Sequence, residues 1–215
     1  MKKIICLFLL AFIFMFTACR AQNSNSSEVN SGGAVGTGDS NTISGNTSEP
    51  QSDNGESGKI LIAYFSWSGN TKQLAEMIQN ETSGDLFTIS PAVPYTDNYD
   101  DLLDIAQQEQ RDNARPKVAE TVSAMDSYDI VFIGYPNWWN DAPKLVLSFL
   151  ESYDLSGKTV IPFCTHGSSG FGRSVDSVKN SAQGANFLDG FEVRGANVGK
   201  AQNDVSSWIS GLNLK

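Results

Sequence analysis

Three short polar segments contain most of the side chains in this sequence that could bind a ligand: residues 66–71, 136–141 and 165–170. Each segment directly follows an apolar run that is typical of a buried strand. In an open parallel sheet, the loops that follow the strands meet at one edge, and ligands bind there. We therefore expect these three segments to form one binding site.

The first segment, Ser66-Trp67-Ser68-Gly69-Asn70-Thr71, places small polar residues between a strand and a helix. Its hydroxyl groups and the unpaired N–H groups of the first helical turn are donors suited to a phosphate group. The segment contains no lysine or arginine, so the helix dipole and hydrogen bonds must balance the negative charge, unlike in nucleoside-triphosphate loops. The alternative is that Ser66 or Ser68 only caps the helix.

The second segment carries two adjacent tryptophans after Pro136 and Asn137. Two indoles left in water at the edge of a sheet are unfavourable, so a flat ligand should cover them. Stacking on an indole contributes on the order of 1 kcal/mol beyond the burial of area. We expect Trp138 to contact the ligand ring and Trp139 to pack against the following helix.

Two of these segments resemble the cofactor loops of flavodoxins. Tyr64-Phe65-Ser66-Trp67-Ser68-Gly69-Asn70-Thr71 is similar to the flavodoxin phosphate loop, with Ser68 in place of a threonine. Ile133-Gly134-Tyr135-Pro136-Asn137-Trp138-Trp139 is similar to the loop that lies beside the isoalloxazine ring. The resemblance covers residues 59–215 and implies FMN as the cofactor.

The third segment contains Thr165, His166, Gly167, Ser168 and Gly170. Glycines here let backbone N–H groups approach the polar pyrimidine edge of a flavin, where they would stabilise its reduced anion. His166 could donate to the same region and make the reduction potential depend on pH. The alternative is a histidine that is hydrogen-bonded within its loop and does not touch the ligand.

The elements that must position these loops are indicated by apolar runs that alternate with amphipathic stretches. The runs predict five strands, at 60–65, 86–89, 130–135, 160–164 and 187–193. The amphipathic stretches predict helices at 71–79, 99–111, 142–153, 172–182 and 201–212. Asp141 is expected to be the N-cap of the third helix, with Pro143 in its first turn.

This alternation predicts an α/β fold, an open doubly wound parallel sheet of five strands with helices on both faces. The resemblance to flavodoxins implies the strand order 2-1-3-4-5. It also implies a short-chain form, because no long segment interrupts the last strand.

Composition excludes several other classes of protein. The chain has 15 basic and 24 acidic residues, a net charge of −9, which argues against binding nucleic acid. Three cysteines and one histidine cannot build a disulfide framework or a zinc ribbon. Cys164 lies in an apolar run without a partner thiol, so we expect it in the core.

The N-terminus is expected to direct export. Two lysines precede an uncharged run, Ile4–Phe16, which is too short to span a membrane and is typical of a signal peptide at 1–18. Small residues before Cys19 resemble the bacterial lipoprotein box, so Cys19 is expected to carry lipid. Residues 20–58 include nine Ser, seven Gly, six Asn and three Thr, which favours a disordered tether.

The preferred interpretation is an exported, lipid-anchored protein of the bacterial cell envelope that binds FMN noncovalently for electron transfer. Its partners would be a redox protein or a small-molecule electron donor or acceptor. One alternative is an NAD(P)H-dependent reductase of quinones, with Arg111, Arg115 and Lys117 as candidates to receive an anionic substrate. The other is a surface binding module that kept the scaffold without the flavin.

The lipid anchor can be tested by exchanging Cys19 for alanine. We expect the variant C19A to lose incorporation of labelled palmitate in bacteria and to leave the membrane fraction, because acyl chains would be the only anchor. C164A is the matched control and should keep its label. A C19A protein that is still labelled would contradict lipidation at this residue.

Overall fold

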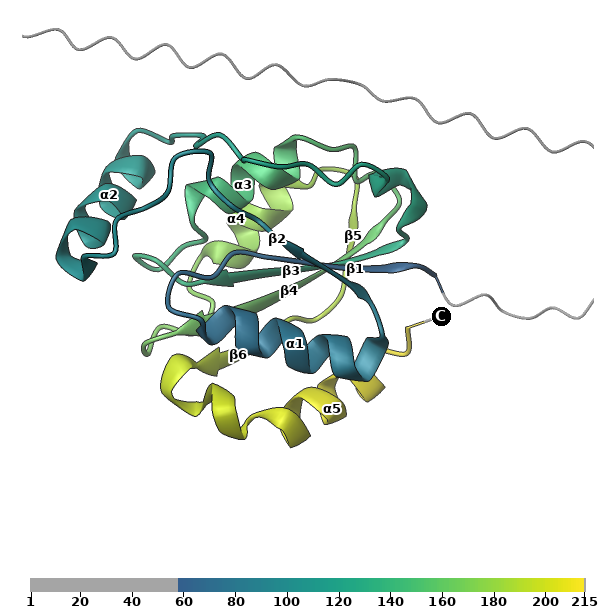
Figure 1. The fold of residues 1–215 in the computed structure, drawn as a ribbon. Helices are drawn as coiled ribbons and strands as arrows, with labels where there is room; N and C mark the ends of the chain where they lie inside the picture. Colours follow the sequence, from purple (N-terminus) through teal and green to yellow (C-terminus); the bar gives the residue numbers. More distant parts are fainter. Residues whose placement is uncertain (1–57, 215) are drawn as a thin grey trace, which may run out of the picture. The chain divides into compact units, whose positions relative to one another are not determined.

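The computed structural model describes residues 58–214 as alternating strands and helices (Figure 1). The strands are β1 (Ile60–Tyr64), β2 (Asp85–Thr88), β3 (Ile130–Pro136), β4 (Thr159–His166), β5 (Asn186–Phe187) and β6 (Phe191–Arg194). The α-helices are α1 (Asn70–Thr82), α2 (Tyr99–Arg111), α3 (Lys144–Glu151), α4 (Ser174–Ser181) and α5 (Gln202–Gly211). Two 3₁₀ helices, η1 (Met125–Ser127) and η2 (Gly195–Lys200), complete the elements.

All strand pairs of the sheet are parallel, and their order is β2-β1-β3-β4-β5, as expected from the sequence. The central strands β1, β3 and β4 are almost fully buried, whereas the edge strand β2 is partly exposed. Such continuous burial is typical of strands that are covered on both faces.

The last strand differs from the prediction, because it consists of two short strands and the sheet therefore has six. β5 pairs with the beginning of β4, and β6 pairs with its end. Leu188 donates its N–H to the Val160 carbonyl (3.3 Å), so Pro162, two residues further along β4, faces the same edge. Proline has no N–H, and the pairing is interrupted opposite it.

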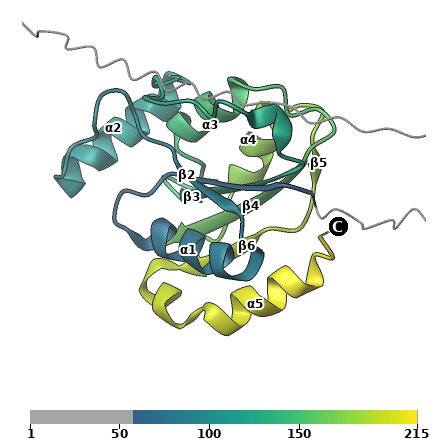
Figure 2. The ribbon, with the colours of Figure 1, turned by 45° about the vertical axis from the view of Figure 1, so that its right-hand side comes forward.

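Different helices cover the two faces of the sheet. Figures 1 and 2 show α1 and α5 on one face and α2, α3 and α4 on the other. Side chains of each strand alternate between the two layers. In β1, Leu61 and Ala63 join the core under α3 and α4, while Ile62 and Tyr64 join the core under α1 and α5.

Backbone hydrogen bonds continue past the strand ends and align the three loops. Phe65 donates its N–H to the Gly134 carbonyl (2.9 Å), and Asn137 donates its N–H to the Thr165 carbonyl (2.8 Å). The segments after β1, β3 and β4 therefore emerge side by side. This is the edge at which the sequence predicts the binding site.

The starts of two helices correct the capping predictions. Gly69 is the N-cap of α1, with φ of 90°, and no side chain caps this helix, so neither Ser66 nor Ser68 does so. Pro143 is the N-cap of α3, and the prediction that Asp141 caps it is wrong. Asp141 instead accepts a hydrogen bond from the Ala142 N–H (2.8 Å) in the loop before the helix.

The predicted signal peptide, Cys19 and the tether lie outside the described residues, apart from Gly58. Within residues 58–214, no helix combines the length and the apolar composition needed to cross a membrane.

Close packing of β3 against β4 makes Gly134 essential for stability. A Cβ atom at this position would lie 2.1 Å from the Phe163 ring, which is completely buried. We expect G134A to lower the free energy of unfolding by about 1–3 kcal/mol, as overpacking of a core does. G211A is the control, because nothing lies within 4 Å of a Cβ there. Equal stability of the two variants in urea unfolding would contradict this packing.

Candidate functional site

A cavity of about 610 Å³ lies where the loops after β1, β3 and β4 meet α2 and the start of η2. The predicted site residues that line it are Trp67, Ser68, Asn70, Asn137, Trp138, Trp139, Thr165, His166 and Gly167. Six other predicted site residues belong to the same loops but do not line the cavity: Ser66, Gly69, Thr71, Pro136, Ser168 and Gly170. The sequence analysis did not assign Tyr99, Leu102, Leu103, Ala106, Gly195 and Ala196 as lining residues.

The polar end of the cavity is formed around the start of α1. Ser66 Oγ accepts the Gly69 N–H (3.1 Å), and Ser68 Oγ accepts a hydrogen bond from the Asn70 amide (3.3 Å). The first N–H groups of α1 have no acceptor within the helix and no capping side chain. Hydroxyl, amide and backbone donors are thus available for an anion at this end.

The Thr71 side chain connects the first loop to the third. Its hydroxyl group is 2.8 Å from the Thr165 hydroxyl, and both residues are buried. This hydrogen bond holds the start of α1 against β4. Whichever hydroxyl accepts in this pair keeps its own O–H as a donor.

The segment after β6 completes the polar end, although it is distant in sequence. Gly195 and Ala196 line the cavity beside Ser68 and Asn70. A Cβ atom at Gly195 would lie 2.6 Å from the Asn70 amide nitrogen. This backbone therefore lies against the Asn70 side chain at the start of α1, and the amphipathic patterns in the sequence contain no sign of this approach.

The two tryptophans exchange the packing roles that we expected. Trp138 is half-buried and meets Phe65 and Tyr95 edge-on, with ring centroids 5.2 and 5.4 Å away. Trp139 is 46% exposed, and its indole N–H donates to the Leu103 carbonyl of α2 (2.9 Å). The prediction that Trp139 packs inward is wrong, while both indoles line the cavity.

A tight turn causes this reversal. Trp138 and Asp141 form an antiparallel bridge, and the two residues between them have positive φ, 50° at Trp139 and 65° at Asn140. Positive φ at both central positions is characteristic of a type I′ turn. It is unfavourable for a bulky residue such as tryptophan, so the surroundings must hold it.

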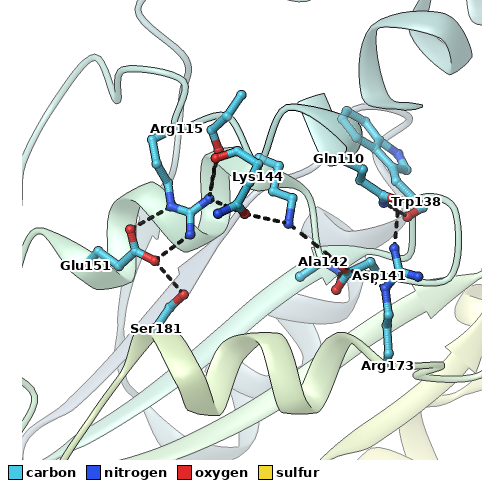
Figure 3. Close-up of polar contacts among 11 residues, drawn as sticks. Gln110, Arg115, Trp138, Asp141, Ala142, Lys144, Glu151, Arg173 and Ser181 are labelled. Carbon is cyan, nitrogen blue, oxygen red and sulfur yellow. Dashed lines mark hydrogen bonds and ion pairs between the residues drawn. The ribbon is translucent and has the colours of Figure 1, made fainter. Parts of the chain in front are cut away.

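A polar network holds the turn against α2 and α4 (Figure 3). Gln110 donates to the Trp138 carbonyl (2.6 Å), and Arg173 donates to the Gln110 side chain (3.0 Å). Arg173 also donates to the buried carboxylate of Asp141 (3.0 Å). The turn thus has side-chain partners on both sides, which compensates its backbone strain.

Helix α2 supplies the apolar wall of the cavity. Its lining residues Tyr99, Leu102, Leu103 and Ala106 follow helical spacing on one face. Tyr99 is 59% exposed and lies 6.0 Å from the Trp67 ring. The spacing shows which residues share a face, but a sequence does not show that this face meets the loops of other strands.

His166 lies at the site, but neither of its ring nitrogens has a free N–H. Its Nδ1 accepts the Gly170 N–H (3.2 Å), so its Nε2 carries the proton and contacts the Glu192 carboxylate. The histidine side chain is only 6% exposed. This arrangement corrects the expectation that His166 and the Gly170 N–H donate to the ligand, because both are used within the protein.

Uncharged groups line the cavity in the described part of the chain. The candidate anion receptors of the sequence analysis lie elsewhere: Arg115 is bound to Glu151 (2.6 Å), and Arg111 donates to Gln107 and Gln108.

Burial raises the pKa of the Cys164 thiol, which lies in the core as predicted. Among residues 58–214, no group of three or more histidine, cysteine, aspartate or glutamate side chains is arranged to hold a metal ion.

One buried side-chain oxygen of a lining residue has no hydrogen-bond partner among residues 58–214. Asn137 Oδ1 is buried and accepts no hydrogen bond. The other end of the same amide is used, since Asn137 Nδ2 donates to the Gly170 carbonyl (2.7 Å). This oxygen has almost no accessible surface, so it does not offer an acceptor to a ligand in the cavity.

Comparison with known proteins defines the class. A family model described as flavodoxin matches residues 59–212. A solved protein of Bacteroides eggerthii DSM 20697, assigned as a flavoprotein, is 34% identical, with a TM-score of 0.66, over 74% of this chain and 99% of that one. The chain therefore belongs to the flavodoxin family.

Other solved structures extend this relationship. A protein of Bacteroides uniformis ATCC 8492, also assigned as a flavoprotein, is 34% identical, with a TM-score of 0.64, over 72% of this chain and 99% of its own. A flavoprotein of Lactobacillus acidophilus NCFM, solved in complex with FMN, is 25% identical, with a TM-score of 0.55, over 66% and 97%. No curated protein sequence matched the chain.

The wall behind Trp138 yields a pH-dependent prediction. Burial raises the pKa of the Glu109 carboxyl, and the Tyr95 hydroxyl that donates to it (3.0 Å) opposes the shift. Because the folded state binds this proton more tightly, ionised Glu109 destabilises the fold as pH rises through its folded pKa. We expect E109Q, which can still accept from Tyr95, to raise the melting temperature slightly at pH 7.

The gain should shrink as the pH falls to about 3, below the ordinary pKa of a glutamate, where the carboxyl is protonated in both states. E120Q removes an exposed acid and serves as the control. A stabilisation by E109Q that is the same at both pH values would show that its cause is not the ionisation of Glu109.

Proposed function

We propose that this chain binds FMN noncovalently and transfers electrons through it. The observation that carries the proposal is the cavity itself, in which an uncharged anion-binding end adjoins an aromatic and apolar wall. Its volume of about 610 Å³ falls within the range usual for cofactor sites. The FMN complex of the 25% identical Lactobacillus acidophilus flavoprotein supports the same cofactor here.

The lining residues fit the two chemical ends of FMN. Ser68, Asn70 and the free N–H groups at the start of α1 would hold the phosphate, with the helix dipole favouring its negative charge. The indoles of Trp138 and Trp139 and the α2 wall would bound the ring.

When bound, FMN supplies the electron-transfer chemistry, and the chain's own residues bind and orient it. The lining residues include no free acid or base, since His166 is held by Gly170 and Glu192. The aromatic and leucine side chains would cover part of the ring and limit its contact with water. The protein's contribution is therefore the position and the surroundings of the cofactor.

An electron carrier fits the site better than a nicotinamide-dependent reductase. The cations that the sequence offered for an NAD(P)H phosphate, Arg111, Arg115 and Lys117, are not among the lining residues of the cavity. Arg115 is already paired with Glu151. We therefore propose that the partner is a redox protein or a small uncharged electron donor or acceptor.

We also propose that the domain works outside the cytoplasm, attached to a membrane through lipid on Cys19. The basic and apolar segment before this cysteine supports export, and the Ser/Gly/Asn-rich stretch after it supports a tether. The C19A experiment described above tests this part separately from flavin binding.

FMN binding can be tested with two serine variants. We expect the purified protein to be yellow and to quench the fluorescence of FMN. We expect S68A to raise the dissociation constant of FMN about ten- to a hundredfold, because a hydrogen bond to a charged group is lost. S207A is the matched control, since Ser207 is exposed on α5 and does not line the cavity. A wild-type protein that fails to retain FMN would overturn the proposed function.

A further inference from the structure

Helix α2 differs from the other α-helices of residues 58–214, because it contributes no residue to either hydrophobic core. Helices α1 and α5 bury side chains in one core, and α3 and α4 bury side chains in the other. The two buried residues of α2, Leu102 and Ala106, line the cavity instead. Since tertiary packing supplies most of the stability of a helix in a protein, α2 is held less tightly than its neighbours.

Hydrogen bonds from two indoles attach α2 to the loops of the sheet. Trp67, in the loop after β1, donates its indole N–H to the Thr96 carbonyl just before the helix (2.9 Å). Trp139, in the loop after β3, donates its indole N–H to the Leu103 carbonyl within the helix (2.9 Å). Both tryptophans also line the cavity. The helix is therefore attached through side chains that face the ligand site.

The end of α2 has further attachments, whereas its start is exposed. Gln110 donates to the Trp138 carbonyl (2.6 Å) and accepts a hydrogen bond from Arg173 (3.0 Å). At the start of the helix, Tyr99 is 59% exposed, and Figures 1 and 2 show α2 at the left margin of the molecule. The end of α2 is thus suited to be the pivot of a movement, and the start to be the part that moves.

The structure leaves space on another side of α2. A second cavity of about 310 Å³ is lined by Ile105 and Glu109 of the helix and by residues 91–95. Ile105 is 37% exposed, and Val93, across this space, is 81% exposed. This side of α2 is loosely packed, so the helix has room to move away from the flavin cavity.

We propose that α2 is a lid over the flavin cavity and that Trp67 and Trp139 are positioning residues, whose indole N–H groups hold the lid closed. This inference rests on the proposed FMN binding and adds a step to it. The loops of the sheet stay in place, while α2 opens to let the nucleotide enter and leave. Opening then sets the rate of FMN exchange, and the contacts inside the closed cavity set the affinity.

The first experiment measures amide hydrogen exchange in the protein without flavin. A detached helix of 13 residues is unstable in water, so opening exposes its amides. We expect the hydrogen-bonded amides of α2 to exchange faster than those of α1 and α3. We expect W67F and W139F, which keep an aromatic ring without the indole N–H, to speed exchange in α2 alone by about two- to tenfold.

W208F is the matched control, because the Trp208 indole N–H also donates to a backbone carbonyl, that of Asp189 (2.9 Å), but lies outside the cavity lining. This variant should leave exchange in α2 unchanged. The lid is overturned if the amides of α2 exchange as slowly as those of α1 and α3. It is also overturned if neither W67F nor W139F changes their exchange.

The second experiment measures the rates at which FMN binds and dissociates, from the quenching of its fluorescence. A loosened lid opens more often both with and without FMN. We therefore expect W67F and W139F to raise both rates by about two- to tenfold and to change the dissociation constant little. The loss of a simple ligand contact would raise the dissociation rate alone. W208F should keep both rates of the wild type.

Failure of the lid and failure of the proposed function are distinguishable. If W67F and W139F raise only the dissociation rate, or neither rate, the two indoles are ligand contacts and α2 is not a lid. If the wild type binds no FMN, the proposed function fails. The amide exchange of α2 then still decides whether the two indoles hold the helix.

Discussion

The parallel alignment of β1, β3 and β4 is the constraint on which the site depends. Because all three strands run in one direction, their following loops open at one edge, and backbone hydrogen bonds from Phe65 to Gly134 and from Asn137 to Thr165 carry the alignment into those loops. The buried contact between the Thr71 and Thr165 hydroxyls then fixes the start of α1 at the same edge. Helix, turn and loop are thereby placed around one cavity.

The site combines an uncharged anion-binding end with aromatic walls, and its strain is confined to one turn. The positive φ of Trp139 is unfavourable in isolation, yet it directs an indole toward α2 while Trp138 packs against Phe65 and Tyr95. The buried carboxylate of Asp141 and its partner Arg173 hold this geometry. Rigid surroundings of this kind position a cofactor whose chemistry is its own.

Local patterns were sufficient for the strands, the helices and the three loops, because apolar periodicity and loop composition are properties of neighbouring residues. The division of the last strand was not predicted, since it depends on Pro162 facing that edge of β4. Capping of α3 was also misassigned. Asp141 has the residue type of an N-cap, but its carboxylate is held by Arg173 and the Ala142 N–H.

The amino-acid sequence by itself determined the fold class, the strand order through its resemblance to flavodoxins, and the loops that meet at the site. Only the tertiary structure decided which loop groups face the cavity. It placed α2 and Gly195 in the wall, paired the Thr71 hydroxyl with that of Thr165, and held His166 between Gly170 and Glu192. The reason is physical: a hydrogen-bonding group remains available to a ligand only if no residue from a distant segment reaches it first.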